Sequence, residues 1–474
     1  MTECIQRNFE FQGLGTREVQ ADFKGGNLSG DGGVVLLREA DSQSGLIDQL
    51  AACFADFRSQ RWIEHSVPEL LRQRIFGMAM GYEDLNDHDS LRFDPVMAAG
   101  VGKPDPLGLE RRGENRGKAL AVKSTLNRLE LTNAKTSGCE TIEGGPHKIR
   151  ANFEAIEALL IAFCVSQLAE DTEELVLDFD ATDSLIHGDQ EGKFFHGYYD
   201  AYCYLPLYCF IGPWPVWAQQ RTSNRDASEG TVEALEKIVP AIRERFPDAH
   251  IIFRGDSGFA RETIFSWCER HGIDYVIGLA KNAVLLRGLE PTMFRAKADA
   301  CVRGGHCTRF CEFDYRTAKT WSRSRRVIGK AQVNPKGENP RFVATSLAGD
   351  IPRWLPEKLY KEFYCARGDM ENRIKEQQLD LFADRMSCAA MSANQLRLWF
   401  STFAYTLMIT LRERGLSKSK TYRQASPATI RNRLLKIATM ITVSTRRVLL
   451  RWSSSFRDQG EIAACVNQLR MASG

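Results

Sequence analysis

The sequence has little that would place it in a membrane or in an oxidising compartment. No apolar run of about 18 residues occurs, which excludes a transmembrane helix. Residues 1–7 lack a basic segment followed by an apolar one, so no signal peptide is expected. The 13 cysteines are an odd number without a regular spacing, which favours reduced thiols over a disulfide framework. We therefore expect a cytoplasmic chain with no membrane partner.

Acidic residues are scarce near the C-terminus. Residues 411–474 contain 13 Lys and Arg but three acids, a net charge of +10, although the whole chain carries only +3. This asymmetry predicts a polyanionic partner for the tail, with a pair of solvated basic helices as the alternative. Basic residues lying among apolar ones predict amphipathic helices there.

What is present is the composition of a globular chain of several domains, with 474 residues, 43% of them hydrophobic and 26% charged. The patterns of helix and strand divide it into five regions. We expect a mainly helical N-terminal region (1–150), the first part of an α/β core (151–280), a β-rich basic insertion (281–350), the second part of the core (351–411) and a basic helical region (412–474). The basic loop 103–123 makes the N-terminal region compatible with DNA binding, and we expect it to be a DNA-binding region.

Two apolar runs in the core end in acids. The run 175–179 is hydrophobic almost throughout, which predicts a strand buried on both faces. A second such strand, 250–255, is followed by Asp256. Strands of this kind deliver charged groups at the C-terminal edge of a sheet, where α/β proteins bind ligands. Strand alternation puts Asp178 and Asp180 on one face, so periodicity does not choose between them.

A third acid lies on a helix predicted after Trp354. Positions 364, 367, 371, 374, 375 and 378 fall on one helical face and carry Tyr, Arg, Glu, Ile, Lys and Gln. An Arg367–Glu371 ion pair on a solvated face is one interpretation. Alternatively, two strand-end aspartates and one helical glutamate hold two divalent cations about 4 Å apart, which activate a water or a 3′-hydroxyl for attack on a phosphodiester.

The core resembles the DDE transposases of bacterial insertion sequences, of the group 1 type, in the branch with a Tyr-x2-Arg-x3-Glu-x6-Lys signature and a β-rich insertion. The resemblance covers roughly residues 175–411. Asp180-Ala181-Thr182 matches the Asp-x-Thr strand end of the family, and Phe253-Arg254-Gly255-Asp256-Ser257 matches its second Asp. The signature is matched by Tyr364, Arg367 and Glu371.

The resemblance implies a fold class, a cofactor and a set of site residues. The fold is an α/β RNase H-like core, a mixed sheet with flanking helices, interrupted by the β-rich insertion and joined to helical N- and C-terminal regions. Asp180, Asp256 and Glu371 are the implied catalytic residues and metal ligands, with two Mg²⁺ ions and Mn²⁺ as a substitute. Tyr364 and Arg367 are the implied DNA contacts near the scissile phosphate.

One position departs from the signature. Its final Lys falls at position 378, which is Gln here, and Lys375 lies one turn earlier as a substitute. We therefore predict Lys375, and also Arg254 beside the second Asp, as further DNA-binding residues. Asp178 is expected to be an inner neighbour of Asp180.

The function expected from these features is DNA transposition by metal-dependent cleavage and strand transfer. The expected partners are terminal inverted repeats and target DNA, with a homodimer in the synaptic complex. A bacterial cytoplasm, in association with the nucleoid, is the expected location. The alternatives are a metal-dependent RNase H-like nuclease or domesticated recombinase, and a catalytically inactive DNA-binding regulator.

Overall fold

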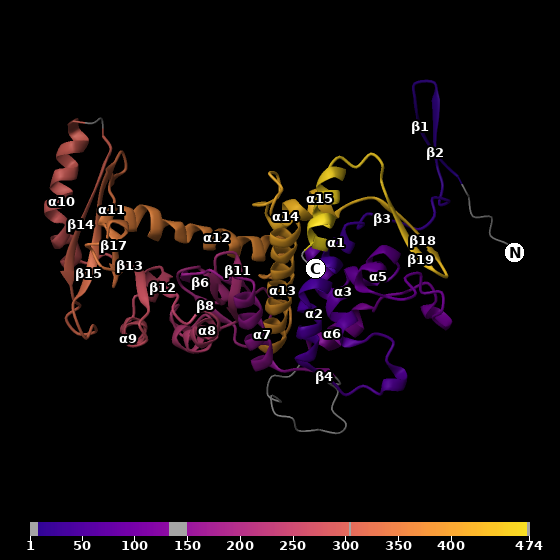
Figure 1. Ribbon diagram of the computed structural model, residues 1–474, viewed down its shortest axis with the longest axis horizontal. Coiled ribbons are helices and arrows are strands. Elements are labelled where there is room, and N and C mark those ends of the chain that lie inside the picture. Colours follow the sequence, from indigo (N-terminus) through magenta and orange to yellow (C-terminus); the bar gives the residue numbers. More distant parts are fainter. Residues whose placement is uncertain (1–7, 132–148, 303–304, 472–474) are drawn as a thin grey trace. The chain divides into compact units, whose positions relative to one another are not determined.

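The computed structural model describes residues 8–131, 149–302 and 305–471 (Figure 1). The chain folds into two compact units. Unit 1 comprises Met1–Ala52, Asp56–Leu129 and Thr410–Gly474, and unit 2 comprises Cys53–Ala55 and Glu130–Ile409. No helix among the described residues is both long enough and apolar enough to cross a membrane. The five-part division expected from the sequence stays a prediction.

Unit 2 is built on a mixed sheet. Its strands are β6 (Glu174–Ala181), β10 (Leu207–Ile211), β11 (Trp214–Gln219), β12 (His250–Gly255), β13 (Asp274–Leu279), β14 (Cys307–Tyr315), β15 (Arg325–Asn334), β16 (Gly337–Glu338) and β17 (Arg341–Thr345). Among the described residues the strand order is β11-β10-β6-β12-β13-β17-β15-β14, with β16 paired to β15. β6, β12 and β13 are parallel to one another, and the other pairs are antiparallel. The prediction that the two Asp-ending strands share one sheet is confirmed.

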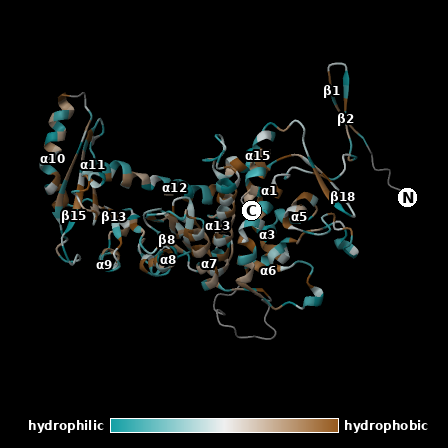
Figure 2. Cartoon of the chain, in the orientation of Figure 1, coloured by the Kyte–Doolittle hydropathy of each residue, from teal (hydrophilic) through white to brown (hydrophobic). Residues whose placement is uncertain are grey.

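Aromatic side chains pack together on the parallel strands β6 and β12. The rings of Phe179 on β6 and Phe253 on β12 stack with their centroids 5.0 Å apart, and Phe259 packs beside both. Figure 2 shows hydrophobic residues over α7, which packs against β11. The helices of this unit are α7 (Phe153–Ser166), α8 (Thr231–Arg245), α9 (Glu262–Arg270), α10 (Ala283–Val302), α11 (Pro356–Lys358), α12 (Gly368–Lys375) and α13 (Met391–Gly415), the last of which runs on into unit 1.

The region 281–350 differs in part from its prediction. The three predicted β runs are present as β14, β15 and β17, and they extend the main sheet. However, α10 was not predicted, and it packs along β14 and β15 (Figure 1). Its buried side chains recur at the helical spacing, on Leu285, Leu289, Met293, Ala296 and Ala300.

Short strands complete unit 2. β10 and β11 form a hairpin. The apolar run 202–211 is interrupted at Pro206, since proline cannot donate to a strand ladder. Its first part, β9 (Ala201–Tyr204), pairs with β7 (Ser184–Leu185) and β8 (Phe194–His196) instead. β4 (Phe54–Asp56) pairs with β5 (Ile149–Ala151).

Unit 1 combines helices with two small sheets. Its helices are α1 (Val34–Ser44), α2 (Leu46–Ala52), α3 (Val67–Ala79), α4 (Asp87–Leu91), α5 (Pro95–Val101), α6 (Lys123–Glu130), α14 (Pro427–Ile430) and α15 (Gln459–Met471). Its strands are β1 (Phe9–Leu14), β2 (Arg17–Ala21), β3 (Leu28–Ser29), β18 (Thr439–Ser444) and β19 (Arg447–Trp452).

The prediction of a helical C-terminal region is wrong for residues 439–452. These residues form the antiparallel hairpin β18–β19, and β18 also pairs with β3 from the N-terminal segment. β-branched Thr439, Ile441 and Val443 alternate along β18, which suits a strand better than a helix. The basic residues of this segment therefore lie on a hairpin instead of on an amphipathic helix.

The N- and C-terminal segments of unit 1 are held together by close backbone contacts. Gly33 N–H donates to the Leu435 carbonyl at 2.9 Å, and Gly32 N–H donates to the Ile437 carbonyl at 3.0 Å. A Cβ at Gly33 would collide with the backbone of Leu435, so this approach requires glycine. Lys436 Nζ lies 2.7 Å from the buried carboxylate of Asp31. The two ends of the chain thus build one core.

Candidate active site

The main sheet brings the two predicted aspartates to the same edge. Asp180 is near the end of β6 and Asp256 directly follows β12, and these neighbouring strands are parallel. Asp256 Oδ1 accepts a hydrogen bond from the Gly258 N–H at 2.8 Å, which caps the 3₁₀ turn Ser257–Phe259. This bond fixes the orientation of the Asp256 carboxylate at the sheet edge.

The segment carrying Glu371 is an irregular helix. It contains a π-helical turn (Leu359–Tyr364), a 3₁₀ turn (Cys365–Arg367), α12 and a second π-helical turn (Glu376–Asp380). π turns are rare and frequent at functional sites, and each one shifts the helical register. Within the predicted helical face, Ile374 is buried and Lys375 is exposed, so the face is not uniformly available to a ligand. Figure 2 shows α12 as mostly hydrophilic.

Arg367 joins Asp180 to Glu371. One of its guanidinium nitrogens lies 3.2 Å from Asp180 Oδ2, and the other lies 2.5 Å from Glu371 Oε1. Burial acts to lower the pKa of Arg367, but Asp180 and then Glu371 outweigh it, so the pKa is raised. The i, i+4 pair of Arg367 and Glu371 is thus real, and it extends to the strand-end aspartate.

Asp180 experiences the other two acids. Burial raises the pKa of Asp180, Arg367 opposes this shift, and Asp256 and Glu371 add to it, so that the pKa is raised to about 7. The three predicted acids are therefore within electrostatic reach of one another at one sheet edge. A positive charge added there would stabilise all three carboxylates.

The fit of this cluster to metal ions depends on how many ligands each ion takes from the protein. Among the described residues no three His, Cys, Asp or Glu side chains gather closely enough to hold one ion. Mg²⁺, however, uses one or two carboxylates and completes its shell with water and phosphate oxygens. Asp180 interacts electrostatically with both Asp256 and Glu371, so ions that each take one or two of these carboxylates fit the site. The guanidinium of Arg367, which contacts Asp180 and Glu371, lies where a positive charge is favoured.

The Tyr364 hydroxyl lies beside Gly278 of β13, at the same edge of the sheet. A Cβ at Gly278 on β13 would collide with the Tyr364 hydroxyl, and it would also lie 3.1 Å from the Ser257 nitrogen. Burial raises the pKa of Tyr364, and the charge of Asp256 raises it as well. The glycine therefore leaves room for the hydroxyl beside the turn that begins at Asp256.

Arg254 is the one predicted site residue whose assignment the structure contradicts. It is 7% exposed, and its guanidinium binds both oxygens of Asp178, at 2.5 and 2.7 Å. Its remaining nitrogen donates to the Phe363 carbonyl at 2.5 Å. A buried guanidinium with these partners has no free face for DNA, so the predicted DNA-binding role is wrong. Asp178 is the inner neighbour that was predicted.

Sequence reasoning missed what Asp178 and Arg254 do together. The two residues lie directly opposite each other in the parallel register of β6 and β12, and their pair holds the backbone just before Tyr364. The signal available in the sequence was an acid and an arginine at matching positions of two buried strands.

Gln378, where the signature has Lys, also has a structural contact. Its Nε2 donates to the Asp183 carbonyl at 2.9 Å, linking the second π turn to the loop after β6. Lys375 is exposed, so its side chain is accessible to a ligand.

The family model described as "Transposase DDE domain group 1" matches residues 11–473. No curated protein matches the chain. Among solved structures, a cryo-EM structure of a piggyBac transposase synaptic complex with hairpin DNA matches with 9% identity and a TM-score of 0.43, over 92% of this chain and 81% of that one. Because the family model spans nearly the whole chain, the protein belongs to the group 1 family of transposase DDE domains.

Proposed function

We propose that this transposase serves an insertion sequence, binds its terminal inverted repeats and moves it by cut-and-paste. The observation that carries the proposal is the meeting of Asp180, Asp256 and Glu371 around Arg367 at one sheet edge. Membership of the family makes the chain a DNA transposase, and these three acids are its best candidates for the reacting centre.

An RNase H-like core is part of the proposal. The strand order β11-β10-β6-β12-β13, with an antiparallel hairpin beside three parallel strands, supports it. In such a sheet the ends of β6 and β12 are adjacent, which accounts for the closeness of Asp180 and Asp256. The strands β17, β15 and β14 would then be the insertion, continuing the sheet from β13.

The proposed cofactor is a pair of Mg²⁺ ions, with Mn²⁺ as a substitute. Asp180, Asp256 and Glu371 would hold them, and the ions would activate the attacking hydroxyl and stabilise the leaving oxygen of the phosphodiester. Arg367 and Tyr364 would contact the DNA backbone beside the acids, because both are partly exposed at this edge. Asp178 and Arg254 would position the segment that carries these two residues.

Three charge-neutral variants test the catalytic assignment. Asp180→Asn, Asp256→Asn and Glu371→Gln should each abolish Mg²⁺-dependent cleavage of a duplex carrying the repeats that flank the gene, while binding of that duplex persists. Asp369→Asn, an exposed acid on the same helix as Glu371, is the matched control and should cleave normally. Full cleavage by any of the three variants would remove that residue from the site.

The products test the finer part of the proposal. Excision followed by joining of the repeat ends to a second DNA supports cut-and-paste transposition by a complex that pairs two ends. Hydrolysis without joining would indicate a nuclease instead.

A further inference from the structure

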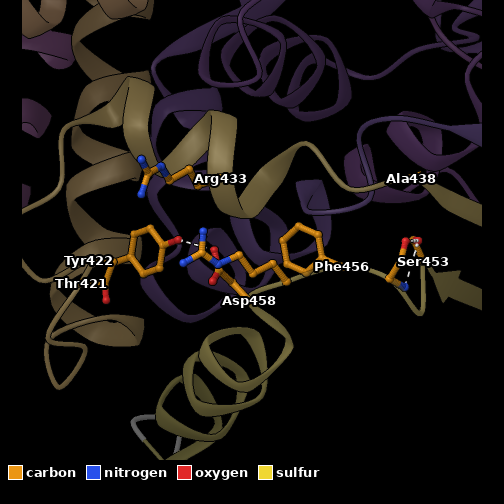
Figure 3. Close-up of a pocket in the computed structure, with 9 residues that line it drawn as sticks. Thr421, Tyr422, Arg433, Ala438, Ser453, Phe456 and Asp458 are labelled. Carbon is orange, nitrogen blue, oxygen red and sulfur yellow. Dashed lines mark hydrogen bonds between the residues drawn. The ribbon is translucent and has the colours of Figure 1, made fainter.

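Two adjoining cavities lie in the C-terminal part of unit 1. Their volumes are about 530 and 620 Å³, and they share Thr421, Arg457 and Asp458 as lining residues. Figure 3 shows the first of them, which is lined by side chains from three separate segments of the chain. These segments are 421–422, the π turn that carries Arg433, and the loop 453–458 that precedes α15.

Tyr422, which is buried, connects two walls of the cavity by hydrogen bonds. The Tyr422 hydroxyl donates to Asp458 Oδ2 at 2.6 Å, and Tyr422 N–H donates to Ser419 Oγ at 2.9 Å. Burial and the bond to Asp458 raise the pKa of Tyr422 to about 12, so the hydroxyl remains a donor at neutral pH. The segment at 419–422 is thus held against the loop before α15 (Figure 3).

The lining is rich in cations without carboxylate partners. Arg433, Arg457, Lys418 and Lys420 are exposed, and no ion pair or hydrogen bond of their side chains occurs within the part of the chain that the structure describes. The lining acids are Asp458, which already accepts from Tyr422, and Glu461 in the first turn of α15. The four cations therefore outnumber the two acids.

Some other cations of unit 1 are paired with acids, unlike these four. Lys436 lies 2.7 Å from Asp31, and Arg72 contacts both Asp41 and Asp48 at 2.8 and 2.7 Å. Unpaired like charges gathered around a cavity repel one another, and they are stabilised by an anion that accepts from them. The hydroxyls of Thr421, Ser453 and Ser455 add neutral donors to the same lining.

We propose that these two cavities bind neighbouring phosphates of a DNA backbone. Guanidinium, ammonium and hydroxyl donors are the groups that contact phosphodiester oxygens in protein–DNA complexes. The site reads no bases, so it would add affinity and fix the register of the duplex without adding sequence preference. The inference rests on the proposed function, because it names a surface through which the transposase holds its DNA.

The salt dependence of DNA binding tests the site. Arg433→Gln/Arg457→Gln and Lys418→Gln/Lys420→Gln should each lower the slope of log K against log salt by about 1.8, since each phosphate contact contributes about 0.9. The affinity should fall to the same degree for a duplex carrying the flanking repeat and for an unrelated duplex. The melting temperature should stay that of the wild type, because the replaced side chains are exposed and unpaired.

Arg423→Gln is the matched control. Arg423 is exposed in the same segment but lines neither cavity, so its replacement should leave the slope unchanged. An unchanged slope in both double variants, or an equal change per charge in Arg423→Gln, would overturn the site. If the salt slopes of the double variants change but the protein does not cleave DNA, the phosphate site stands and the proposed function falls. If the protein cleaves DNA normally but the slopes do not change, the proposed function stands and the phosphate site falls.

Discussion

Asp180 is the residue of the candidate site whose charged form is disfavoured both by burial and by two neighbouring acids. Its carboxyl is partly buried at the end of β6, faces Asp256 and Glu371, and has Arg367 as its nearest compensating charge. Carboxylates placed so close to one another destabilise the folded chain unless a cation is added. This arrangement supports the proposed binding of cations at the site.

Neutralising Asp180 should therefore stabilise the protein when divalent ions are removed. In EDTA at pH 8, Asp180→Asn should raise the free energy of unfolding by about 1–2 kcal/mol, because one member of the acid cluster loses its charge. Added Mg²⁺ should raise the melting temperature of the wild type and have less effect on the variant. Thermal unfolding with and without Mg²⁺ measures both effects, and an equal Mg²⁺ response in the two proteins would contradict the assignment.

The Asp178–Arg254 pair is a second residue-level test, since both partners are buried. Removing one partner, as in Asp178→Asn or Arg254→Met, should cost about 3–5 kcal/mol of unfolding free energy, because the other charge is left buried without its partner. Asp178→Asn/Arg254→Met should cost less than the sum of the two single changes. Urea unfolding measures the cycle, and additive losses would show that the two residues act independently.

At the scale of elements, the irregular helix that carries Tyr364 packs against the sheet at one glycine, Gly278. Gly278→Ala on β13 should cost about 1–3 kcal/mol, since its Cβ would push away the Tyr364 hydroxyl. In a Tyr364→Phe background the same change should cost less, because the colliding oxygen is gone. Equal costs in the two backgrounds, measured by denaturant unfolding, would mean that Tyr364 does not lie against Gly278.

The strand β15 and the helix α9 are joined by a buried arginine. Arg325 pairs with Glu262 at 2.8 Å and with Glu269 at 2.8 Å, while its own side chain is 1% exposed. Burial opposes ionisation of Glu262, but the hydrogen bond from Arg325 and further bonds lower its pKa to about 2.

This depressed pKa gives a prediction for acid stability. An unfolded Glu262 binds a proton near pH 4.5, whereas the folded one binds it only near pH 2. The stabilising contribution is therefore complete above about pH 4.5 and is lost as the pH falls from there toward 2. Glu262→Gln should have a smaller loss of stability across that window, and chemical unfolding at pH 5, 4 and 3 measures it. A parallel pH dependence of the two proteins would contradict the pairing.

At the scale of the whole molecule, the two ends of the chain share the core of unit 1. Leu435, Ile441, Ile462 and Leu469 are buried, and α1 contacts α15. A chain ending after residue 415 would lose these side chains and the strand partner of β3.

Truncation after residue 415 should therefore unfold unit 1 in addition to removing basic residues. The truncated protein should lose the protease resistance of residues 34–129 and gain fast amide exchange there, because their packing partners are gone. Protected amides in that range would show that the N-terminal helices fold by themselves. Point variants such as Arg433→Gln/Arg457→Gln are consequently the better probe of DNA binding by this region.

Local patterns predicted much of the core. Continuous hydrophobicity over 175–179 and 250–255 predicted the strands β6 and β12. The same reasoning failed where a pattern allowed two structures. Basic and apolar residues are mixed at 439–452, and pairing of β18 with β3, from the other end of the chain, selected the hairpin.

Sequence alone determined which residues are the candidates for the chemistry: two strand-end aspartates, a glutamate on a helix, and the tyrosine and arginine before it. Tertiary structure decided how they are held. Only the register of β6 with β12 sets Arg254 against Asp178 inside the protein, and only the tertiary fold brings Asp180 on β6 to the Arg367–Glu371 pair of the later helix. The physical reason is that burial and pairing depend on contacts between distant segments, which no local period records.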